Sequence, residues 1–175
     1  WLELLAGPSH HLDLLLWLAY STALRRTAAA IFLPGSPGSG KSLLSVGLAQ
    51  IWTRGKPTDI TQAFAGFNEA LLHCPLVVSD EIGIPRVNGK VASEQFRRLV
   101  AEHQRPLTKK FAHDATLFGC VRVMVLANNA RTLSLESEFL DEMDILAIAE
   151  RIYHIHVEDK ATRYLRSLSR TTVDS

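Results

Sequence analysis

The sequence predicts a three-layer α/β sandwich with a mainly parallel central sheet. Four short apolar runs, at residues 28–33, 75–79, 121–127 and 152–157, are typical of buried strands. Helical patterns separate several of these runs, and such alternation favours parallel strands joined by helical crossovers. The chain has 175 residues, 47% of them hydrophobic and 21% charged. This suffices for one domain with a real core and excludes a disordered or fibrous protein.

The amino-terminal part is predicted to be helical in two pieces, at residues 1–5 and 9–24. Gly7-Pro8 interrupts the helical pattern between them, and Ser9 is a candidate N-cap of the second piece. The uncharged apolar run inside that piece, 14–24, is too short to span a bilayer, so no membrane partner is expected.

The other elements are expected in order along the chain. Helices are predicted where apolar residues recur at helical spacing, at residues 41–52, 67–73, 92–103, 138–149 and 159–168. A short strand is expected at 58–60. Asn88-Gly89 is a turn signal within residues 87–90, and weak alternation at 108–118 predicts a hairpin.

Two observations bear on how the chain is organised and where it works. It begins with Trp1 rather than Met, so we expect an excised part of a longer protein, with a helical segment at 1–27 and a core domain at 28–175. Cys74 and Cys120 lack metal-ligand spacing and each flanks an apolar run. They are expected to be buried free thiols, which fits a reducing cytoplasm.

Eight consecutive residues after the first core strand match the motif G-x-x-x-x-G-K-[ST]. They are Gly35, Ser36, Pro37, Gly38, Ser39, Gly40, Lys41 and Ser42. The glycines let successive backbone N–H groups turn inward around an anion, and the helix that follows adds its positive end. Lys41 would reach the β- and γ-phosphates of ATP, and the Ser42 hydroxyl would ligate Mg²⁺. The motif therefore predicts a nucleoside triphosphate site.

Polar residues at the ends of two later strands predict what happens to the nucleotide. One strand runs into Asp80 and Glu81, which places two carboxylates beside the phosphate loop in such folds. We expect Asp80 to hold Mg²⁺ through water and Glu81 to orient or deprotonate the attacking water. The next strand ends at Asn128 and Asn129, and an amide there can hydrogen-bond that water and the γ-phosphate. Asn128 is the preferred candidate because it lies nearer the strand end.

An arginine late in the chain completes the candidate catalytic set. Arg151 precedes the last strand and could act across a subunit boundary on a neighbour's γ-phosphate. A salt-bridged surface position is the alternative interpretation of Arg151, and Arg131 is a second candidate for the same role.

These parts, in this order, resemble those of an AAA+ ATPase. Residues 17–20 and 31–42 look like the L-G-Y…F-L-x-G-x-x-G-x-G-K-S entry of superfamily 3 helicases, and are similar to the helicase domain of phage and plasmid primase-helicases. Residues 96–129 resemble the extra motif that these helicases carry before the sensor asparagine. Ala149-Glu150-Arg151-Ile152 is similar to their R-R-I arginine-finger segment, although Glu150 stands where the family has a first arginine.

The resemblance implies a P-loop NTPase fold of the AAA+ type, with ATP and Mg²⁺ as ligands. It also implies a ring, a hexamer or another homo-oligomer, that acts on single-stranded DNA in replication. A primase domain or other replication proteins are the implied partners. The implied location is the cytoplasm of a bacterial host, with the protein encoded by a phage or mobile element.

The chain has a net charge of +1, yet it contains one strongly basic and one strongly acidic segment. Residues 97–110 carry five basic side chains against one acidic, a net charge of +4, whereas 136–150 carry six acidic side chains and no basic one. By the resemblance, a hairpin before the sensor strand grips single-stranded DNA, so Lys109, Lys110 and His113 are candidate DNA contacts. A solvated basic face, or lysines that reach a neighbour's nucleotide, are the alternatives.

The sequence therefore predicts an ATP-hydrolysing motor, the helicase or translocase core of a replication protein. A nucleotide-dependent switch or loader that binds DNA without unwinding it is the alternative hypothesis. A small-molecule kinase on the same fold is a third hypothesis, which the strand ending in Asn128 and the lack of an evident arginine-rich lid disfavour.

Overall fold

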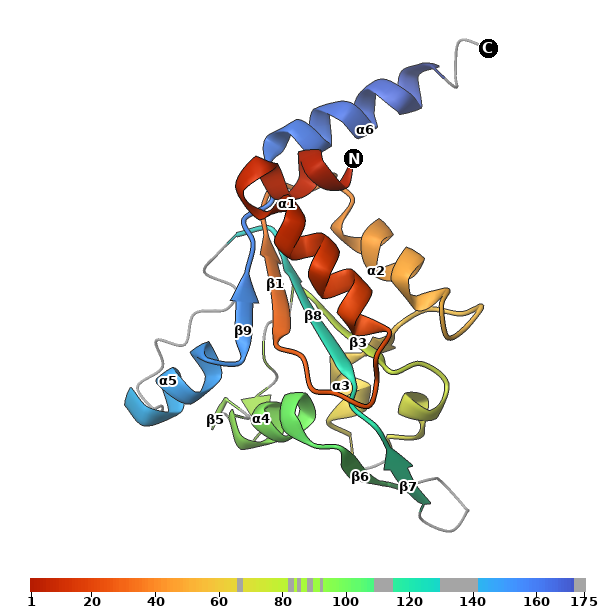
Figure 1. Ribbon diagram of the computed structural model, residues 1–175, viewed down its shortest axis with the longest axis vertical. Coiled ribbons are helices and arrows are strands. Elements are labelled where there is room, and N and C mark those ends of the chain that lie inside the picture. The colour runs from red at the N-terminus through yellow and green to blue at the C-terminus, as the bar shows by residue number, and fades with distance from the viewer. Residues whose placement is uncertain are drawn as a thin grey trace.

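A computed structural model of the chain describes residues 1–65, 68–81, 84, 86–87, 90–91, 93–108, 115–129 and 142–171 (Figure 1). Its main sheet has five strands in the order β2-β3-β8-β1-β9, and each neighbouring pair is parallel. The strands are β1 (Ala30–Pro34), β2 (Thr58–Asp59), β3 (Leu76–Asp80), β8 (Arg122–Ala127) and β9 (Ile152–His154). The predicted α/β fold with a parallel sheet is confirmed.

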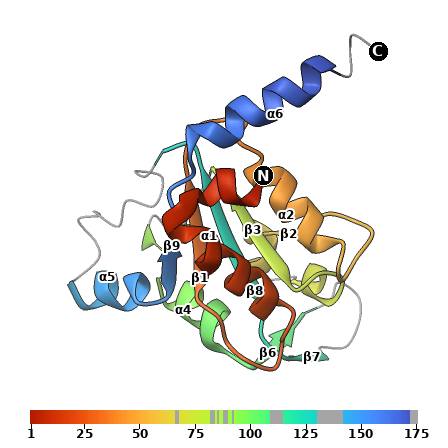
Figure 2. The same cartoon turned by 45° about the horizontal axis from the view of Figure 1, so that its top comes forward.

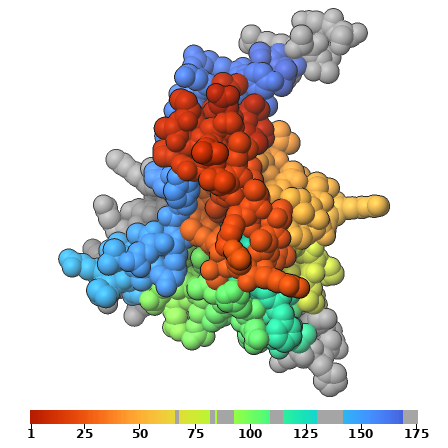
Figure 3. Space-filling model, viewed as in Figure 1, coloured from red at the N-terminus to blue at the C-terminus, as the bar shows by residue number. Residues whose placement is uncertain are grey.

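Helices cover both faces of this sheet and give three layers. On one face lie α1 (Leu2–Ser21), α2 (Lys41–Ala49) and α6 (Asp159–Thr171). On the other face lie α3 (Ile60–Ala63), the 3-10 helix η1 (Glu69–Leu72), α4 (Ser93–Ala101) and α5 (Glu142–Ala149). Figure 2 shows α1 and α2 in front of the strands, with α6 above them. In the space-filling view α1 and α6 occupy adjoining parts of one face of the molecule (Figure 3).

The two cores follow from the alternation of side chains along the buried strands. In β1, Ile31 and Leu33 join the core under α1 and α2, whereas Ala30 and Phe32 join the core on the opposite face. Leu5, Leu14 and Trp17 of α1 join the first core as well. The predicted boundary between 1–27 and 28–175 falls between α1 and β1 and stays a prediction.

Helix α1 consists of two helical pieces, as predicted from Gly7-Pro8. Gly7 has non-helical angles (φ 68°, ψ 166°), and Pro8 follows as the first residue of the second piece, where its missing N–H is not needed. The prediction that Ser9 caps this piece is wrong, because Gly7 takes the cap position and Ser9 lies inside the helix. The helix also ends at Ser21, before the predicted residue 24.

Two smaller antiparallel pairs lie outside the main sheet. Strand β4 (Arg86–Val87) pairs with β5 (Lys90–Val91) on either side of the turn signal, and β6 (Gln104–Leu107) pairs with β7 (Ala115–Phe118). The hairpin predicted at 108–118 therefore begins earlier than expected. Gln104 and Arg105 make the start of β6 polar in sequence, yet Arg105 and Leu107 are buried and alternate with the exposed Gln104 and Pro106. Of the predicted helix at 138–149, residues 138–141 lie outside the described residues.

Both cysteines are buried free thiols, as predicted. Burial raises the pKa of the Cys74 thiol. Over the described ranges, no group of three or more His, Cys, Asp or Glu side chains is placed to hold a metal ion. None of the helices in the described part of the chain has the length and apolar character needed to cross a membrane.

Arg122, at the start of β8, is a buried cation that ties the end of α1 to the sheet. Its side chain is 1% exposed, and its guanidinium donates to the carbonyl oxygens of Ser21 (3.0 Å), Ala23 (2.8 Å) and Arg26 (2.9 Å). Burial lowers the pKa of Arg122. The Ser21 carbonyl is at the end of α1, where carbonyls carry partial negative charge, and the Ala23 and Arg26 carbonyls lie just beyond the helix. Together they stabilise the guanidinium in place of water.

We expect the Arg122→Met variant to lose about 2–4 kcal/mol of unfolding free energy, because methionine fills the space but leaves the buried Ser21 carbonyl and two partly buried carbonyls without this donor. Urea denaturation of the purified chain measures this loss. Arg26→Met is the matched control, since the Arg26 side chain is exposed, and it should change the unfolding free energy by less than about 0.5 kcal/mol. Equal stability of the two variants would contradict this role of Arg122.

Candidate nucleotide-binding site

The carboxyl ends of three parallel strands meet at one edge of the sheet. In register, Pro34 of β1 lies beside Ala127 of β8, and Asp80 of β3 lies beside Leu126 of β8. The Gly35 N–H donates to the Ala127 carbonyl (3.0 Å), and the Glu81 N–H donates to the Leu126 carbonyl (2.9 Å). The phosphate loop, the acidic pair and the asparagine of the next strand are therefore placed side by side by backbone pairing.

The loop needs glycine at two positions for reasons of space and backbone conformation. Gly40, at the cap of α2, has φ 92°, and a Cβ there would lie 2.7 Å from the Trp1 ring and 2.8 Å from Leu165. A Cβ at Gly35 would lie 2.6 Å from the Val157 carbonyl oxygen. The loop is thus packed between the sheet on one side and Trp1 and α6 on the other.

Lys41 is buried in the loop that precedes it. Its side chain is 6% exposed, and Nζ donates to the carbonyl oxygens of Gly35 (2.7 Å) and Ser36 (3.0 Å) and to Oδ1 of Asn128 (3.4 Å). Burial lowers the pKa of Lys41, and the charges of Glu81 and Asp80 oppose that shift. A positive charge is therefore held at the centre of the site before any phosphate arrives.

The two acidic residues face different partners. The Ser42 hydroxyl donates to Oδ2 of Asp80 (3.1 Å), so a hydroxyl and a carboxylate oxygen converge. The Asn128 N–H donates to Oε2 of Glu81 (3.1 Å). Glu81 has φ 63°, a left-handed conformation that is strained for a residue with a side chain. Such strain is typical of functional positions, and here it turns the backbone directly after β3.

These residues surround a hollow of about 310 Å³. It is lined by Pro37, Gly38, Ser39, Gly40, Lys41, Ser42, Leu43, Asp80, Glu81 and Asn128. Backbone N–H groups, one ammonium and hard oxygen donors are the groups that a triphosphate with Mg²⁺ requires. The side chains present therefore fit both ligands, with Ser42 and Asp80 as the residues that would hold the metal.

Other predicted site residues lie elsewhere. Asn129 is not among the residues that line the hollow, whereas Asn128 is. The Arg151 carbonyl accepts from the Ala30 N–H (2.8 Å), which places Arg151 where β1 begins, at the edge of the sheet opposite the phosphate loop. A five-residue strand spans roughly 15 Å, beyond the reach of an arginine side chain. Arg131, Lys109, Lys110 and His113 lie outside the described residues.

Sequence reasoning missed two side chains that hold the loop from outside. The Trp1 indole N–H donates to the Ser39 carbonyl (3.2 Å), and the Ser36 hydroxyl donates to Oδ1 of Asp159 at the start of α6 (2.5 Å). Both partners are remote in sequence, and neither belongs to a motif. No local pattern could have found them.

Of the comparisons with known proteins, the one with solved structures found similar folds. No protein-family model matches the chain, and no curated protein matches it. The apo structure of the NrS-1 C-terminal region is similar, with a TM-score of 0.67 at 15% identity over 94% of this chain and 41% of that one. JCV helicase, solved with a bound thiazolopyridine acetamide, is similar with a TM-score of 0.57 at 16% identity over 95% and 45%.

The chain thus spans less than half the length of these two solved chains. At 15% and 16% identity the structural similarity shows the fold alone, and the JCV helicase has this fold. This confirms the fold class that the resemblance to superfamily 3 helicases implies.

The lowered pKa of Lys41 predicts that nucleotide binding weakens at alkaline pH. Lys41 should lose its proton at a lower pH than an ordinary lysine, and with it the charge that meets the phosphates. As the pH rises, affinity for a fluorescent ATP analogue should therefore begin to fall before an ordinary lysine would lose its proton, as fluorescence titration can measure.

Unfolding would not explain this fall. Because the pKa of Lys41 is lower in the folded chain, the unfolded chain binds more protons between the two pKa values, so this group makes stability rise with pH there. A Lys41→Met variant should bind more weakly and lose most of this pH dependence. A wild-type affinity that stays constant over the range would contradict the prediction.

Proposed function

We propose that this chain is the ATP-hydrolysing core of a helicase or translocase of the superfamily 3 type, acting as a ring on single-stranded DNA. The observation that carries the proposal is the meeting of Lys41, Ser42, Asp80, Glu81 and Asn128 around one hollow. The fold, which the JCV helicase also has, supports it.

In this proposal the phosphate loop binds the triphosphate by exchanging partners. Lys41 leaves the Gly35 and Ser36 carbonyls, and its ammonium donates to phosphate oxygens instead. The loop N–H groups and the start of α2 add a fixed positive field. A Mg²⁺ ion held by Ser42 and, through water, Asp80 would neutralise charge on the β- and γ-phosphates.

Hydrolysis then requires a base and a group that positions the attacking water. Glu81 is the proposed base, because it lines the hollow and its carboxylate accepts a hydrogen bond from the Asn128 N–H. The Asn128 side-chain oxygen accepts from Lys41, which leaves its NH₂ group to donate to the water or the γ-phosphate.

Arg151 completes the site only in an assembly. It lies at the opposite edge of its own sheet, so its guanidinium can reach a γ-phosphate only on another copy of the chain. The proposed partners are therefore further copies of this chain in a ring, single-stranded DNA, and a primase domain or other replication proteins. The proposed setting is the cytoplasm of a bacterial cell that hosts a phage or mobile element.

Residues between strands β6 and β7 supply the proposed DNA contacts. Strands β6 and β7 form an antiparallel hairpin on the face of the sheet away from α1 and α2, and Lys109, Lys110 and His113 lie between the two strands in sequence. Phosphate attraction of this kind does not depend on sequence and is screened by salt.

The catalytic assignment predicts different defects for two substitutions. Lys41→Ala should lose nucleotide affinity and turnover together, whereas Glu81→Gln should still bind ATP but lose turnover by on the order of 100-fold or more. Phosphate release with Mg²⁺ and single-stranded DNA, combined with nucleotide titration, measures both.

The control for these variants is Lys56→Ala, which removes an exposed lysine outside the hollow and should behave as wild type. Wild-type protein that releases no phosphate under any of these conditions would contradict the proposal. So would a Lys41→Ala variant that is indistinguishable from wild type.

The DNA assignment predicts a change in salt dependence. Replacing Lys109 and Lys110 by alanine should weaken binding to single-stranded oligonucleotides of any sequence, and should lower the slope of log K against log salt by about 1.4. Fluorescence anisotropy over a salt series measures the slope. A Lys56→Ala/Lys160→Ala double variant removes equal charge from other exposed positions, and an equal fall in slope there would reject the assignment.

A further inference from the structure

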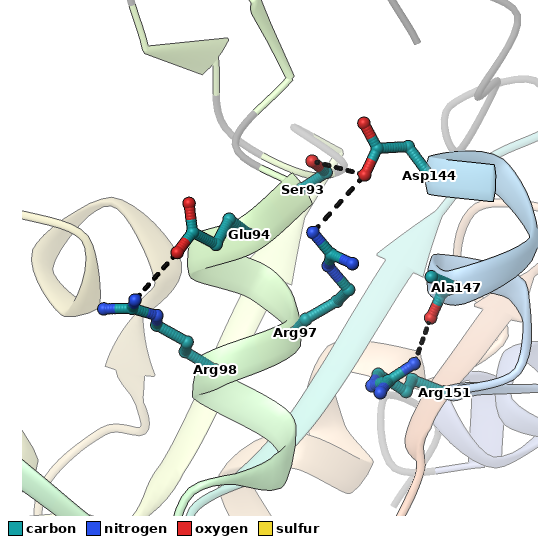
Figure 4. A network of polar contacts seen from close by, with 7 residues as sticks. All are labelled: Ser93, Glu94, Arg97, Arg98, Asp144, Ala147 and Arg151. Carbon is teal, nitrogen blue, oxygen red and sulfur yellow. Dashed lines mark hydrogen bonds and ion pairs between the residues drawn. The ribbon is translucent and has the colours of Figure 1, made fainter. Parts of the chain in front are cut away.

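Helices α4 and α5 are joined by a polar link across the face of the sheet (Figure 4). Asp144, in the first turn of α5, accepts from Nη2 of Arg97 (3.4 Å) and from the Ser93 hydroxyl (3.4 Å), and both donors belong to α4. The carboxylate of one helix is thus held by two groups of the other.

Arg151 is held in turn by α5. Its Nη1 donates to the Ala147 carbonyl (2.5 Å), and its N–H donates to the Ile148 carbonyl (3.0 Å). Figure 4 shows Arg97 on α4 and Arg151 at the end of α5, on opposite sides of the gap between the two helices, with Asp144 above them. The position of the Arg151 guanidinium therefore depends on where α5 lies.

Apolar packing gives α5 few anchors of its own. Of its eight residues Ile148 is the buried one, whereas Met143 is 74% and Leu146 53% exposed. A short helix with one buried side chain is weakly fixed by the hydrophobic effect alone. A polar link to α4, which buries Phe96, Leu99 and Val100, can then decide its position.

The link is better shielded than the ion pair on the other side of α4. Arg97 and Asp144 are 35% and 31% exposed, whereas Arg98 and Glu94, which pair within α4 (2.8 Å), are both 64% exposed. Exposed pairs within a helix contribute little, and shielded pairs between elements contribute more. Arg97 therefore links α4 to α5, whereas its neighbour Arg98 pairs within α4.

We propose that Arg97 and Asp144 are positioning residues for Arg151: their link fixes α5 so that the Arg151 guanidinium meets the triphosphate of a second copy. This inference rests on the proposed function, in which Arg151 acts between copies. Arg97 touches no residue that lines the hollow of its own chain in the described contacts, so its effect is exerted through α5.

The first test compares Arg97→Ala with Arg98→Ala. Both variants remove one positive charge from α4, so a general effect of lost positive charge would be equal in the two. With saturating DNA, Arg97→Ala should lower kcat by on the order of 10- to 100-fold with little change in KM for ATP, as misplacement of a group needed in the transition state does. Arg98→Ala should keep wild-type kcat.

The second test mixes subunits. Arg97→Ala subunits have an intact phosphate loop but a misplaced Arg151. Lys41→Ala subunits have a phosphate loop that neither binds nor hydrolyses ATP normally, but a correctly placed Arg151. A mixed assembly should therefore regain ATPase activity above the sum of its parts. If Arg97 instead supported the catalytic site of its own chain, mixing would restore nothing, and that result would overturn the proposal.

The third test exchanges the two charges. Arg97→Asp combined with Asp144→Arg should recover much of the activity that either single variant loses. Failure of the double variant to exceed both single variants would mean that the individual side chains, and not the link, matter.

A last measurement does not depend on ATPase activity, and so separates failure of this inference from failure of the proposed function. Hydrogen–deuterium exchange of residues 142–151 should be faster in Arg97→Ala and Asp144→Asn than in wild type, and unchanged in Arg98→Ala. Equal exchange in all four proteins would show that the link does not fix α5, whether or not the chain hydrolyses ATP.

Discussion

Parallel backbone pairing of β3, β8 and β1 is the constraint on which the site depends. Each strand ends at the same edge, so the residue after each end enters a common space without any side-chain recognition. Lys41, Glu81 and Asn128 are far apart in the chain and are brought together in this way. The two buried cores stabilise the sheet, and the sheet positions the residues of the site.

Within that frame the site is organised before ligands bind. Lys41 is held in a buried position by hydrogen bonds to loop carbonyls, and Glu81 is held in a strained conformation by strand pairing and the Asn128 N–H. A site arranged in this way needs little rearrangement when phosphate arrives, which is how fixed dipoles stabilise developing charge most effectively. The opposite edge of the same sheet carries Arg151, so one chain presents two complementary halves of the proposed site on opposite ends.

The sequence predicted the parts whose signals are local. Apolar runs predicted the four main strands, and the glycine, lysine and serine spacing of the phosphate loop predicted which strand end matters. Interactions between remote residues could not be predicted. Arg122 would ordinarily be expected on the surface, yet it is buried because the end of α1 offers it carbonyl oxygens. Trp1 and Asp159 reach the loop only through the fold. The polar residues Gln104 and Arg105 gave no strand signal at the start of β6. The second piece of α1 begins at Pro8, which places Ser9 inside the helix and not at its cap.

The central claim is that one chain holds half of an ATP site and a second copy supplies the other half. Light scattering of the purified chain, with a non-hydrolysable ATP analogue and single-stranded DNA, tests this directly. The account predicts a monomer of 19.4 kDa without ligands and a defined multiple of that mass when the analogue and DNA are bound. A chain that binds the analogue yet keeps a mass of 19.4 kDa would contradict it.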